Sequence, residues 1–263
     1  MKNSIPEPIP LPKAVEQLLP VAARSYFWSA HRRRPAFLII LVTGLVAFLT
    51  WLPAGSRTSL WVAFSAQRGL VALLFLFMAV TLSMIWSAGQ RLDTQVFLLF
   101  NTRNYPKWLD RCMWLATQLG NMLAAFIAAL LFFILNDRRL AIEIIFGTLT
   151  LWLLVEIIKA LIDRDRPFLT LDKARVIGWK ERGDSFPSGH TSQIFFLVTL
   201  FVQHLQLNMA MAVIFYAIAV LVGFTRIYVG AHYPRDVIAG LVLGSVWGLL
   251  TMLVDPYWHV LGF

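Results

Sequence analysis

Seven apolar stretches, each close to the length of a membrane crossing, limit what this chain can fold into more than any other feature. A transmembrane helix needs roughly 20 mainly apolar residues. The stretches cover residues 36–53, 66–88, 112–135, 139–162, 188–206, 209–229 and 235–254. Only 14% of the residues are charged, whereas soluble domains carry about 25%. The sequence therefore predicts an all-α, polytopic bundle with about six to seven transmembrane helices, the short first stretch leaving the number open.

The segments around these stretches suggest how the chain is organised. Residues 1–35 form a polar, basic N-terminal tail, and residues 36–88 supply a first transmembrane hairpin. Residues 89–254 make up the core that carries the charged motifs, and residues 255–263 are a C-terminal tail. The connection 89–111 alternates apolar and polar groups, which is typical of a helix lying along the membrane interface.

Small residues indicate how one of the helices packs. Gly240, Gly244 and Gly248 recur at intervals of four in the last stretch. This spacing leaves one helix face without side chains, so that another helix can approach closely.

Charged and polar motifs gather at one end of the predicted bundle. An even number of crossings separates the loop 163–187 from the turn 230–234, so both lie on the same side of the membrane. The first motif is "KALIDRDRP", in which Lys159 and Arg166 are seven residues apart. If the helix continued to Arg166, both cations would share one face, but Pro167 predicts that the helix ends there. The alternative is that Lys159 merely extends to the membrane surface.

The second motif, "PSGH", spans residues 187–190 and opens the fifth apolar stretch. Ser188 is a favoured helix cap, and the first turn of a helix offers free N–H groups that bind anions such as phosphate. Gly189 lets a ligand approach the backbone. His190 would lie beside that anion, although it is otherwise an ordinary histidine at the membrane interface.

The third motif, "TRIYVGAHYPRD", spans residues 225–236. Arg226 ends the sixth stretch, His232 falls in the turn, and Asp236 follows four residues later. This spacing lets Asp236 accept a hydrogen bond from one ring nitrogen of His232, which leaves the other nitrogen free for chemistry. The alternative is that Asp236 only caps the last helix.

Together the motifs predict a binding site for a polyanion. Lys159, Arg166 and Arg226 are three fixed cations at one end of an apolar bundle. A phosphate ester or diphosphate suits them, because phosphoryl transfer depends mainly on positioning and charge neutralisation. Two histidines suit an attacking group and a proton donor. We expect no cofactor and no metal, since no Asp, Glu and His residues recur with metal-ligand spacing.

The three motifs resemble those of the type 2 phosphatidic acid phosphatase (PAP2) superfamily, whose phosphate pocket is related to that of vanadium haloperoxidases. All three occur in order over residues 159–236. Thr225 stands where the family usually has serine, and it keeps the hydroxyl group. Many bacterial members have six transmembrane helices, so the first stretch would be an addition.

The resemblance implies a role for each motif residue. His232 would be the nucleophile that forms a phosphohistidine, with Asp236 orienting it, and His190 would protonate the leaving group. The phosphoryl oxygens would be held by the remaining motif residues, which are Lys159, Arg166, Ser188, Gly189 and Arg226.

The expected activity is hydrolysis of a lipid phosphate or diphosphate. Undecaprenyl diphosphate and glycerophospholipid phosphates are the first candidates that the resemblance implies, and lipid A phosphatase or phosphotransferase activity is the alternative. A transporter, or a membrane protein that binds phosphate without catalysis, would keep the cations but would not need the paired histidines. The expected partners are the lipid substrate and the bilayer, without nucleic acid, and the oligomeric state is left open.

The expected location is the bacterial inner membrane, with the active site facing the periplasm. In a seven-helix topology, the basic groups of residues 32–34 and 103–111 share a side with the site. Lysine and arginine are enriched in the cytoplasmic loops of membrane proteins, and this positive-inside rule would place that side in the cytoplasm. Most bacterial members of the family have the opposite arrangement, and we follow the resemblance.

Overall fold

The computed structural model describes residues 66–85 and 87–254, together with residues 43, 47 and 50. The chain divides into two units at residue 60, and all the helices named below belong to the second unit. The predicted tails 1–35 and 255–263 lie outside the described residues, as does almost all of the predicted span 36–53.

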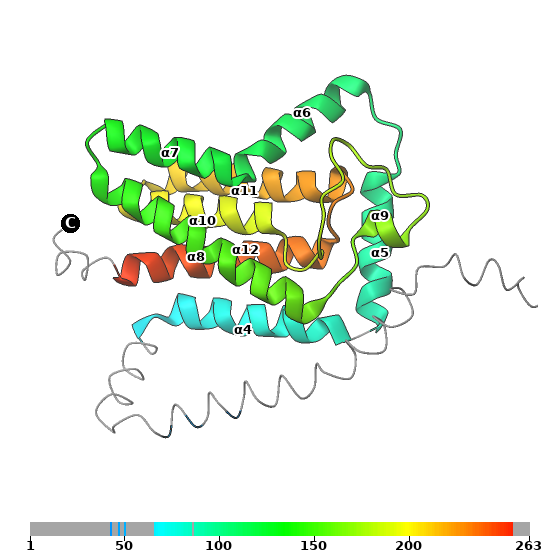
Figure 1. Ribbon diagram of the computed structural model, residues 1–263, viewed down its shortest axis with the longest axis horizontal. Coiled ribbons are helices and arrows are strands. Elements are labelled where there is room, and N and C mark those ends of the chain that lie inside the picture. Colours follow the sequence, from blue (N-terminus) through cyan, green and yellow to red (C-terminus); the bar gives the residue numbers. More distant parts are fainter. Residues whose placement is uncertain (1–42, 44–46, 48–49, 51–65, 86, 255–263) are drawn as a thin grey trace, which may run out of the picture. The chain divides into compact units, whose positions relative to one another are not determined.

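All regular structure in the described part of the chain is helical (Figure 1). The longer helices are α4 (Arg68–Leu82), α5 (Ser87–Asn101), α6 (Lys107–Thr117), α7 (Met122–Ile134), α8 (Arg138–Ile162), α10 (Gly189–His204), α11 (Met209–Tyr228) and α12 (Pro234–Val254). Two 3₁₀ turns, η1 (Ser83–Ile85) and η2 (Gln118–Gly120), and the short helix α9 (Pro167–Thr170) lie between them. The prediction of an all-α fold is confirmed for this region.

Three of the described helices are long and apolar enough to cross a membrane on their own, namely Arg138–Thr170, Met209–Tyr228 and Pro234–Met252. A fourth crossing is possible if α6 and α7 together form one span. The predicted continuous helix 112–135 is wrong, because the chain breaks at residues 118–121 and bends by 59°. Asn121 ends one segment and caps the next by accepting a hydrogen bond from Leu123 N.

Helix α10 lies at the centre of the bundle and contacts α8, α11 and α12 (Figure 1). Its residues 191–200 are all buried. The predicted glycine face of α12 packs directly on it: a Cβ atom at Gly240 would lie 2.7 Å from Ser188 O, and one at Gly248 would lie 2.7 Å from Thr199 Cβ. This close approach fixes the start of α12 against the start of α10, where two of the predicted motifs lie.

Figure 1 shows α5, α9 and the long loop that follows α9 at the same end of the bundle. The loop 171–188 is fastened there by Asn101 of α5. Its side-chain amide donates to Arg175 O at 2.8 Å and to Tyr228 O at 2.9 Å, while its oxygen accepts from Arg175 N at 2.7 Å. Buried polar groups are thereby satisfied, and the loop is held over the turn between α11 and α12.

Candidate active site

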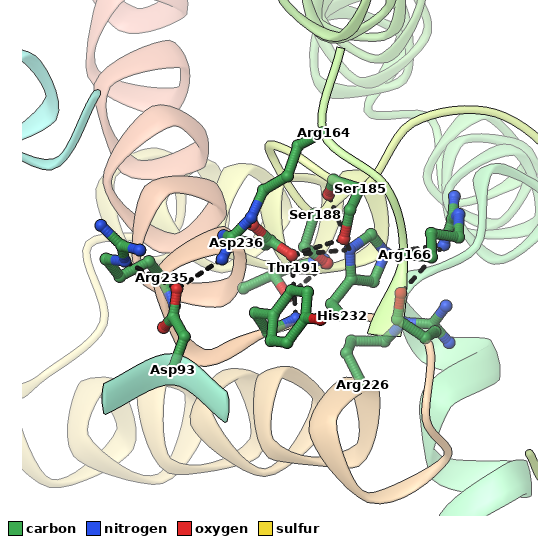
Figure 2. A network of polar contacts seen from close by, with 12 residues as sticks. Asp93, Arg164, Arg166, Ser185, Ser188, Thr191, Arg226, His232, Arg235 and Asp236 are labelled. Atoms are coloured by element: carbon green, nitrogen blue, oxygen red, sulfur yellow. Dashed lines mark hydrogen bonds and ion pairs between the residues drawn. The ribbon is translucent and has the colours of Figure 1, made fainter. Parts of the chain in front are cut away.

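The predicted site residues come from several separate segments of the chain and meet at this end of the bundle (Figure 2). His232 lies in the turn between α11 and α12, and Asp236 lies in the first turn of α12. Arg226 is in the last turn of α11, and His190 is in the first turn of α10. Arg166 immediately precedes α9.

The hydrogen bonds of His232 define which ring nitrogen is free. Its Nδ1 lies 2.8 Å from Ser185 O, a carbonyl oxygen that can only accept. The proton is therefore on Nδ1. Its Nε2 lies 3.3 Å from Arg166 Nη1, a group that can only donate, so Nε2 presents its lone pair. This is the arrangement that a nucleophilic imidazole requires.

The surroundings of His232 also keep it uncharged. Its side chain is 1% exposed. Burial first, and then the positive charges of Arg166 and Arg226, hold the pKa of His232 well below its ordinary value. The imidazole therefore remains available as a base and nucleophile under conditions in which an exposed histidine would be protonated.

The predicted direct hydrogen bond between Asp236 and His232 is not formed. The nearest carboxylate oxygen, Oδ2, lies 3.7 Å from Nδ1, beyond hydrogen-bonding distance. That oxygen accepts instead from Ser185 Oγ at 2.5 Å and from Tyr233 N at 2.8 Å, and Oδ1 is paired with Arg164 (Figure 2). Asp236 thus acts on His232 through its charge and through Ser185, whose carbonyl orients the ring.

Arg166 reaches the site from outside helix α8. That helix ends at Ile162, where Asp163 adopts a left-handed conformation and donates its N–H to Lys159 O at 2.8 Å. Arg166 follows in an extended conformation before the proline that begins α9. Lys159 and Arg166 therefore do not share a helical face. The helix ends at residue 162, where the predicted apolar stretch 139–162 ends, and not at Arg166 as Pro167 suggested.

The guanidinium group of Arg166 is almost fully buried and makes several contacts at once. Its Nε donates to Gly183 O at 2.9 Å, and its Nη1 lies 3.2 Å from Ala231 O and 2.8 Å from the carboxylate of Glu181. The same Nη1 faces His232. These contacts fix one donor of Arg166 beside the free nitrogen of the histidine.

Arg226, the second cation, faces the same carboxylate. Its Nη1 donates to Thr117 Oγ1 at 2.7 Å, and its Nη2 pairs with Glu181 Oε1. Glu181 also lies 3.8 Å from His232 Nε2 and 3.9 Å from His190 Nδ1. Its carboxylate is thus an anion surrounded by the residues that were predicted to bind one.

The charges around Glu181 favour its ionised form. Burial alone would raise the pKa of Glu181, but the charges around it, with Arg226 foremost, hold that pKa far below its ordinary value. The residue was not predicted as part of the site. It was visible only as one of many charges in the loop 163–187, and nothing in its spacing showed that the loop folds it back between two arginines.

The start of α10 lies beside these groups. Ser188 caps the helix, as predicted, since its Oγ accepts from Thr191 N at 3.4 Å and from Thr191 Oγ1 at 2.9 Å. Its side chain is fully buried and its N–H donates to Asp236 O at 3.0 Å. Gly189 and His190 line the neighbouring cavity, whereas Ser188 does not. A role for the Ser188 hydroxyl in holding phosphate stays a prediction.

A cavity of about 340 Å³ opens beside the cations. Its polar wall includes Arg166, His190 and His232, and its apolar wall includes Leu151 and Val155 of α8. The cavity thus has a polar wall and an apolar wall, which together could accommodate a ligand with a polar group and an apolar chain.

Lys159 also lines this cavity, one helical turn from Val155. Its Nζ pairs with Glu156 Oε1 at 2.8 Å. Within the described residues, no group of three or more His, Cys, Asp or Glu side chains is placed to hold a metal ion.

Comparisons with known proteins agree with this geometry. Residues 140–259 match the sequence profile of the PAP2 superfamily. The chain is 34% identical over 164 residues to phosphatidylglycerophosphatase B of Bacillus subtilis, covering 57% of this chain and 75% of that protein. The chain belongs to the PAP2 superfamily. The predicted family is thereby confirmed, and the matched residues include the three motifs.

Two further likenesses extend over much of the chain. The undecaprenyl-diphosphatase of Sulfolobus acidocaldarius is 28% identical over 191 residues, which is 71% of this chain and 90% of that protein. The crystal structure of a transmembrane PAP2-type phosphatidylglycerolphosphate phosphatase from B. subtilis has the same fold, with a TM-score of 0.59 and 24% identity over 72% of this chain and 96% of the other. The described part of this chain therefore has the helical fold of a PAP2 membrane protein.

A third likeness is shorter but stronger. The lipid A 1-phosphatase of Rhizobium johnstonii is 45% identical over 71 residues, and this chain spans only 28% of that protein's length. The named relatives are all phosphatases or diphosphatases of lipids.

Proposed function

We propose that this PAP2 protein hydrolyses the phosphate or diphosphate group of a membrane lipid through a phosphohistidine on His232. The observation that carries the proposal is the pair of arginines, Arg166 and Arg226, that converge on one anion beside the free Nε2 of that histidine. The Glu181 carboxylate occupies the place that we assign to the substrate phosphate. A carboxylate and a phosphate are recognised by guanidinium groups in the same way.

In the first step, the lone pair of His232 Nε2 attacks phosphorus and the bond to the leaving oxygen breaks. Arg166 and Arg226 neutralise the charge on the equatorial oxygens, which is the main catalytic requirement of phosphoryl transfer. His190 donates a proton to the leaving alkoxide or phosphate. The Nδ1–H of His232 stays hydrogen-bonded to Ser185 O, and Asp236 stabilises the positive charge that the ring gains.

In the second step, water attacks phosphorus and the bond to Nε2 breaks. His190, which has lost its proton in the first step, removes one from the water. The products are inorganic phosphate and the starting form of both histidines. The guanidinium groups supply the positive charge that a metal ion supplies in other phosphatases, so we expect hydrolysis without a metal.

The cavity favours a lipid as the substrate. Its apolar wall on α8 includes Leu151 and Val155, which belong to the core of the bundle, and Trp152, which is exposed on the outside of the helix. The relatives named above make undecaprenyl diphosphate and a glycerophospholipid phosphate the first candidates. The 45% identity to a lipid A 1-phosphatase over 71 residues favours a second candidate, in which the substrate is lipid A.

The test is phosphate release from a panel of these lipids by the full chain in detergent, with EDTA present throughout. The expected result is turnover of at least one lipid by the wild type and none by His232→Ala. Turnover by His232→Ala would refute the mechanism, and loss of activity in EDTA would refute metal independence. A wild type that binds the lipids but releases no phosphate from any of them would instead support a non-catalytic phosphate-binding protein or a transporter.

The same proposal includes the topology. Residues 89–254 form the catalytic core, preceded by the hairpin 36–88, and six to seven helices cross the bacterial inner membrane with α5 along its surface. The site then faces the periplasm, and with seven crossings the C-terminus is cytoplasmic. A reporter fused after Phe263 tests this: we expect fluorescence from a cytoplasmic fusion, and activity of a periplasmic phosphatase reporter would contradict it.

A further inference from the structure

We propose that Arg164, held by Asp93 of α5, is a positioning residue that fixes the His232 imidazole and offsets the charge of Asp236. The inference rests on the function proposed above, because it concerns the same reaction. A second network of charged side chains, which the mechanism does not use, lies next to His232 (Figure 2). The network consists of two arginines and two aspartates, which are Arg164, Arg235, Asp93 and Asp236.

Arg164 contacts three residues next to His232. Its backbone oxygen accepts from Ser185 N at 2.7 Å, and Ser185 in turn holds the Nδ1 of the histidine. Its Nη1 pairs with Asp236 Oδ1. Its guanidinium carbon lies 4.4 Å from the centre of the Tyr233 ring, next to His232 in the chain. Displacing Arg164 would therefore loosen all three supports at once.

Asp93 determines where the guanidinium group of Arg164 lies. Its Oδ2 pairs with Arg164 Nη2 at 2.5 Å and accepts from Arg235 Nε at 2.6 Å, while its Oδ1 accepts from Arg235 N at 3.0 Å. Gln90, one turn earlier on α5, adds a bond to Arg164 Nη2 at 2.7 Å. The interfacial helix is thereby connected to the nucleophile through two successive ion pairs.

These ion pairs are largely shielded from water, so the loss of one partner has a large effect. The Asp93 and Asp236 side chains are 3% and 0% exposed, and that of Arg164 is 9% exposed. Removing one partner of such a pair leaves an uncompensated charge away from water. Because Asp236 Oδ2 is 3.7 Å from His232 Nδ1, an unpaired Asp236 would attract a proton to the imidazole. Arg164 thus helps to keep the nucleophile unprotonated.

Other charges facing His232 set the baseline against which this effect is measured. They come from each element around the turn and are Lys159 of α8, Arg166 before α9, Glu181 of the loop, Arg226 of α11 and Asp236 of α12. None of them changes in a variant of Arg164. A change in the titration of His232 in such a variant therefore reports the loss of the Arg164 charge beside Asp236.

Arg164 does not line the cavity beside His232, and both of its terminal nitrogens are engaged by α5 and Asp236. We therefore expect Arg164→Gln to lower kcat by about 10²-fold, the size of effect that a misplaced reacting group produces, with little change in KM. The acidic limb of the pH profile of kcat/KM should move to higher pH, because His232 gains a proton more readily. Arg164→Lys should recover part of kcat.

Asp93→Asn is the opposite perturbation. It keeps the shape of the side chain but leaves the Arg164 charge less neutralised, so the acidic limb should move to lower pH. Arg235→Gln is the matched control, because it removes a partly buried arginine that pairs with Asp93 but not with Asp236. It should lower the melting temperature while leaving the acidic limb in place.

The titration of His232 can also be followed without turnover, by carbon NMR of the full chain in micelles with labelled histidine, assigned with His232→Gln. We expect the pKa of His232 to rise in Arg164→Gln and to stay unchanged in Arg235→Gln. An active wild type whose Arg164→Gln variant keeps its kcat and its His232 pKa would overturn this inference alone. An inactive wild type would overturn the proposed function, while the NMR titration would still decide the role of Arg164.

Discussion

Helix α10 has a histidine near each end, and the two surroundings are opposite in charge. His190, at the start, lies among Arg166, Arg226 and Glu181, where cations outnumber the single carboxylate. His204, at the end, lies between two carboxylates, with its Nδ1 3.1 Å from Glu143 and its Nε2 3.2 Å from Asp137.

The difference shows what makes a histidine at a membrane surface functional. Both are partly buried, with side chains 24% and 16% exposed, so burial does not distinguish them. At the His204 end, both ring nitrogens already face protein acceptors, and the residue ties the start of α8 to the end of α10. At the His190 end, the neighbouring cations attract an external anion, and a cavity lies alongside. The charge of the neighbouring side chains, and not burial, therefore distinguishes the proposed catalytic histidine from the structural one.

The largest contrast is expected from His232 and His204. His232→Ala should remove lipid phosphate hydrolysis entirely, since it removes the imidazole nitrogen that lies 3.3 Å from Arg166 Nη1 and that we assign as the nucleophile. His204→Ala should retain turnover. Initial rates of phosphate release, measured on detergent-purified protein of verified monodispersity, make the comparison. Equal losses in the two variants would mean that the two ends do not differ in function.

His190→Ala should have the next largest effect. Loss of a general acid costs about 10²–10⁴-fold in rate. A substrate with a better leaving group, such as an aryl phosphate ester, should be affected less, because its leaving oxygen needs no proton. The ratio of the two rates in wild type and variant measures the effect. An equal loss for both substrates would speak against His190 as the proton donor.

Glu181→Gln should strengthen the binding of an external anion. Inorganic phosphate must displace the Glu181 carboxylate from Arg166 and Arg226, and removing that competitor should lower the inhibition constant of phosphate by roughly tenfold, the equivalent of about 1.4 kcal/mol. The variant also takes a negative charge away from His232, so the acidic limb of kcat/KM should move to lower pH. An unchanged inhibition constant would indicate that phosphate binds elsewhere.

The smallest effect on rate, but a clear one on stability, is expected from His204→Gln. Glu143 is fully buried there, and one of its oxygens would lose its hydrogen-bonding partner. An unsatisfied buried group costs about 1–3 kcal/mol. Thermal unfolding in detergent should show a lower melting temperature with kcat unchanged. A wild-type melting temperature would mean that the carboxylates at this end do not need the histidine.

Much of the site was predictable because its motifs lie at helix ends. The bounds of the apolar stretches predicted where α8, α10, α11 and α12 begin and end. The even number of membrane crossings between the motifs predicted that they share one end of the bundle, as Arg166, His190, Arg226 and His232 do. The contacts made by residues outside the helices were not predictable. The spacing of apolar residues predicts helices, but it does not show where the loop 171–188 places Glu181 and Ser185.

The direct bond from Asp236 to His232 illustrates the same limit. Its four-residue spacing was compatible with the bond, but competition from Ser185, Tyr233 and Arg164 for the same carboxylate decides the geometry. The broken span at residues 118–121 is a second case. The apolar composition of the sequence continues through the break. At Gly120 the chain lies so close to the start of α10 that a Cβ atom there would be 2.6 Å from His190 O.

The most direct test of the central claim is to trap the phosphoryl group on the protein. Wild-type enzyme turning over a phosphate-labelled lipid is quenched in base, in which phosphohistidine survives, and the modified peptide is identified by mass spectrometry. We predict phosphorylation of His232 in the wild type and no phosphorylated peptide in His232→Ala. Phosphate on a different residue, or hydrolysis that persists in His232→Ala, would contradict the assignment of His232 as the nucleophile.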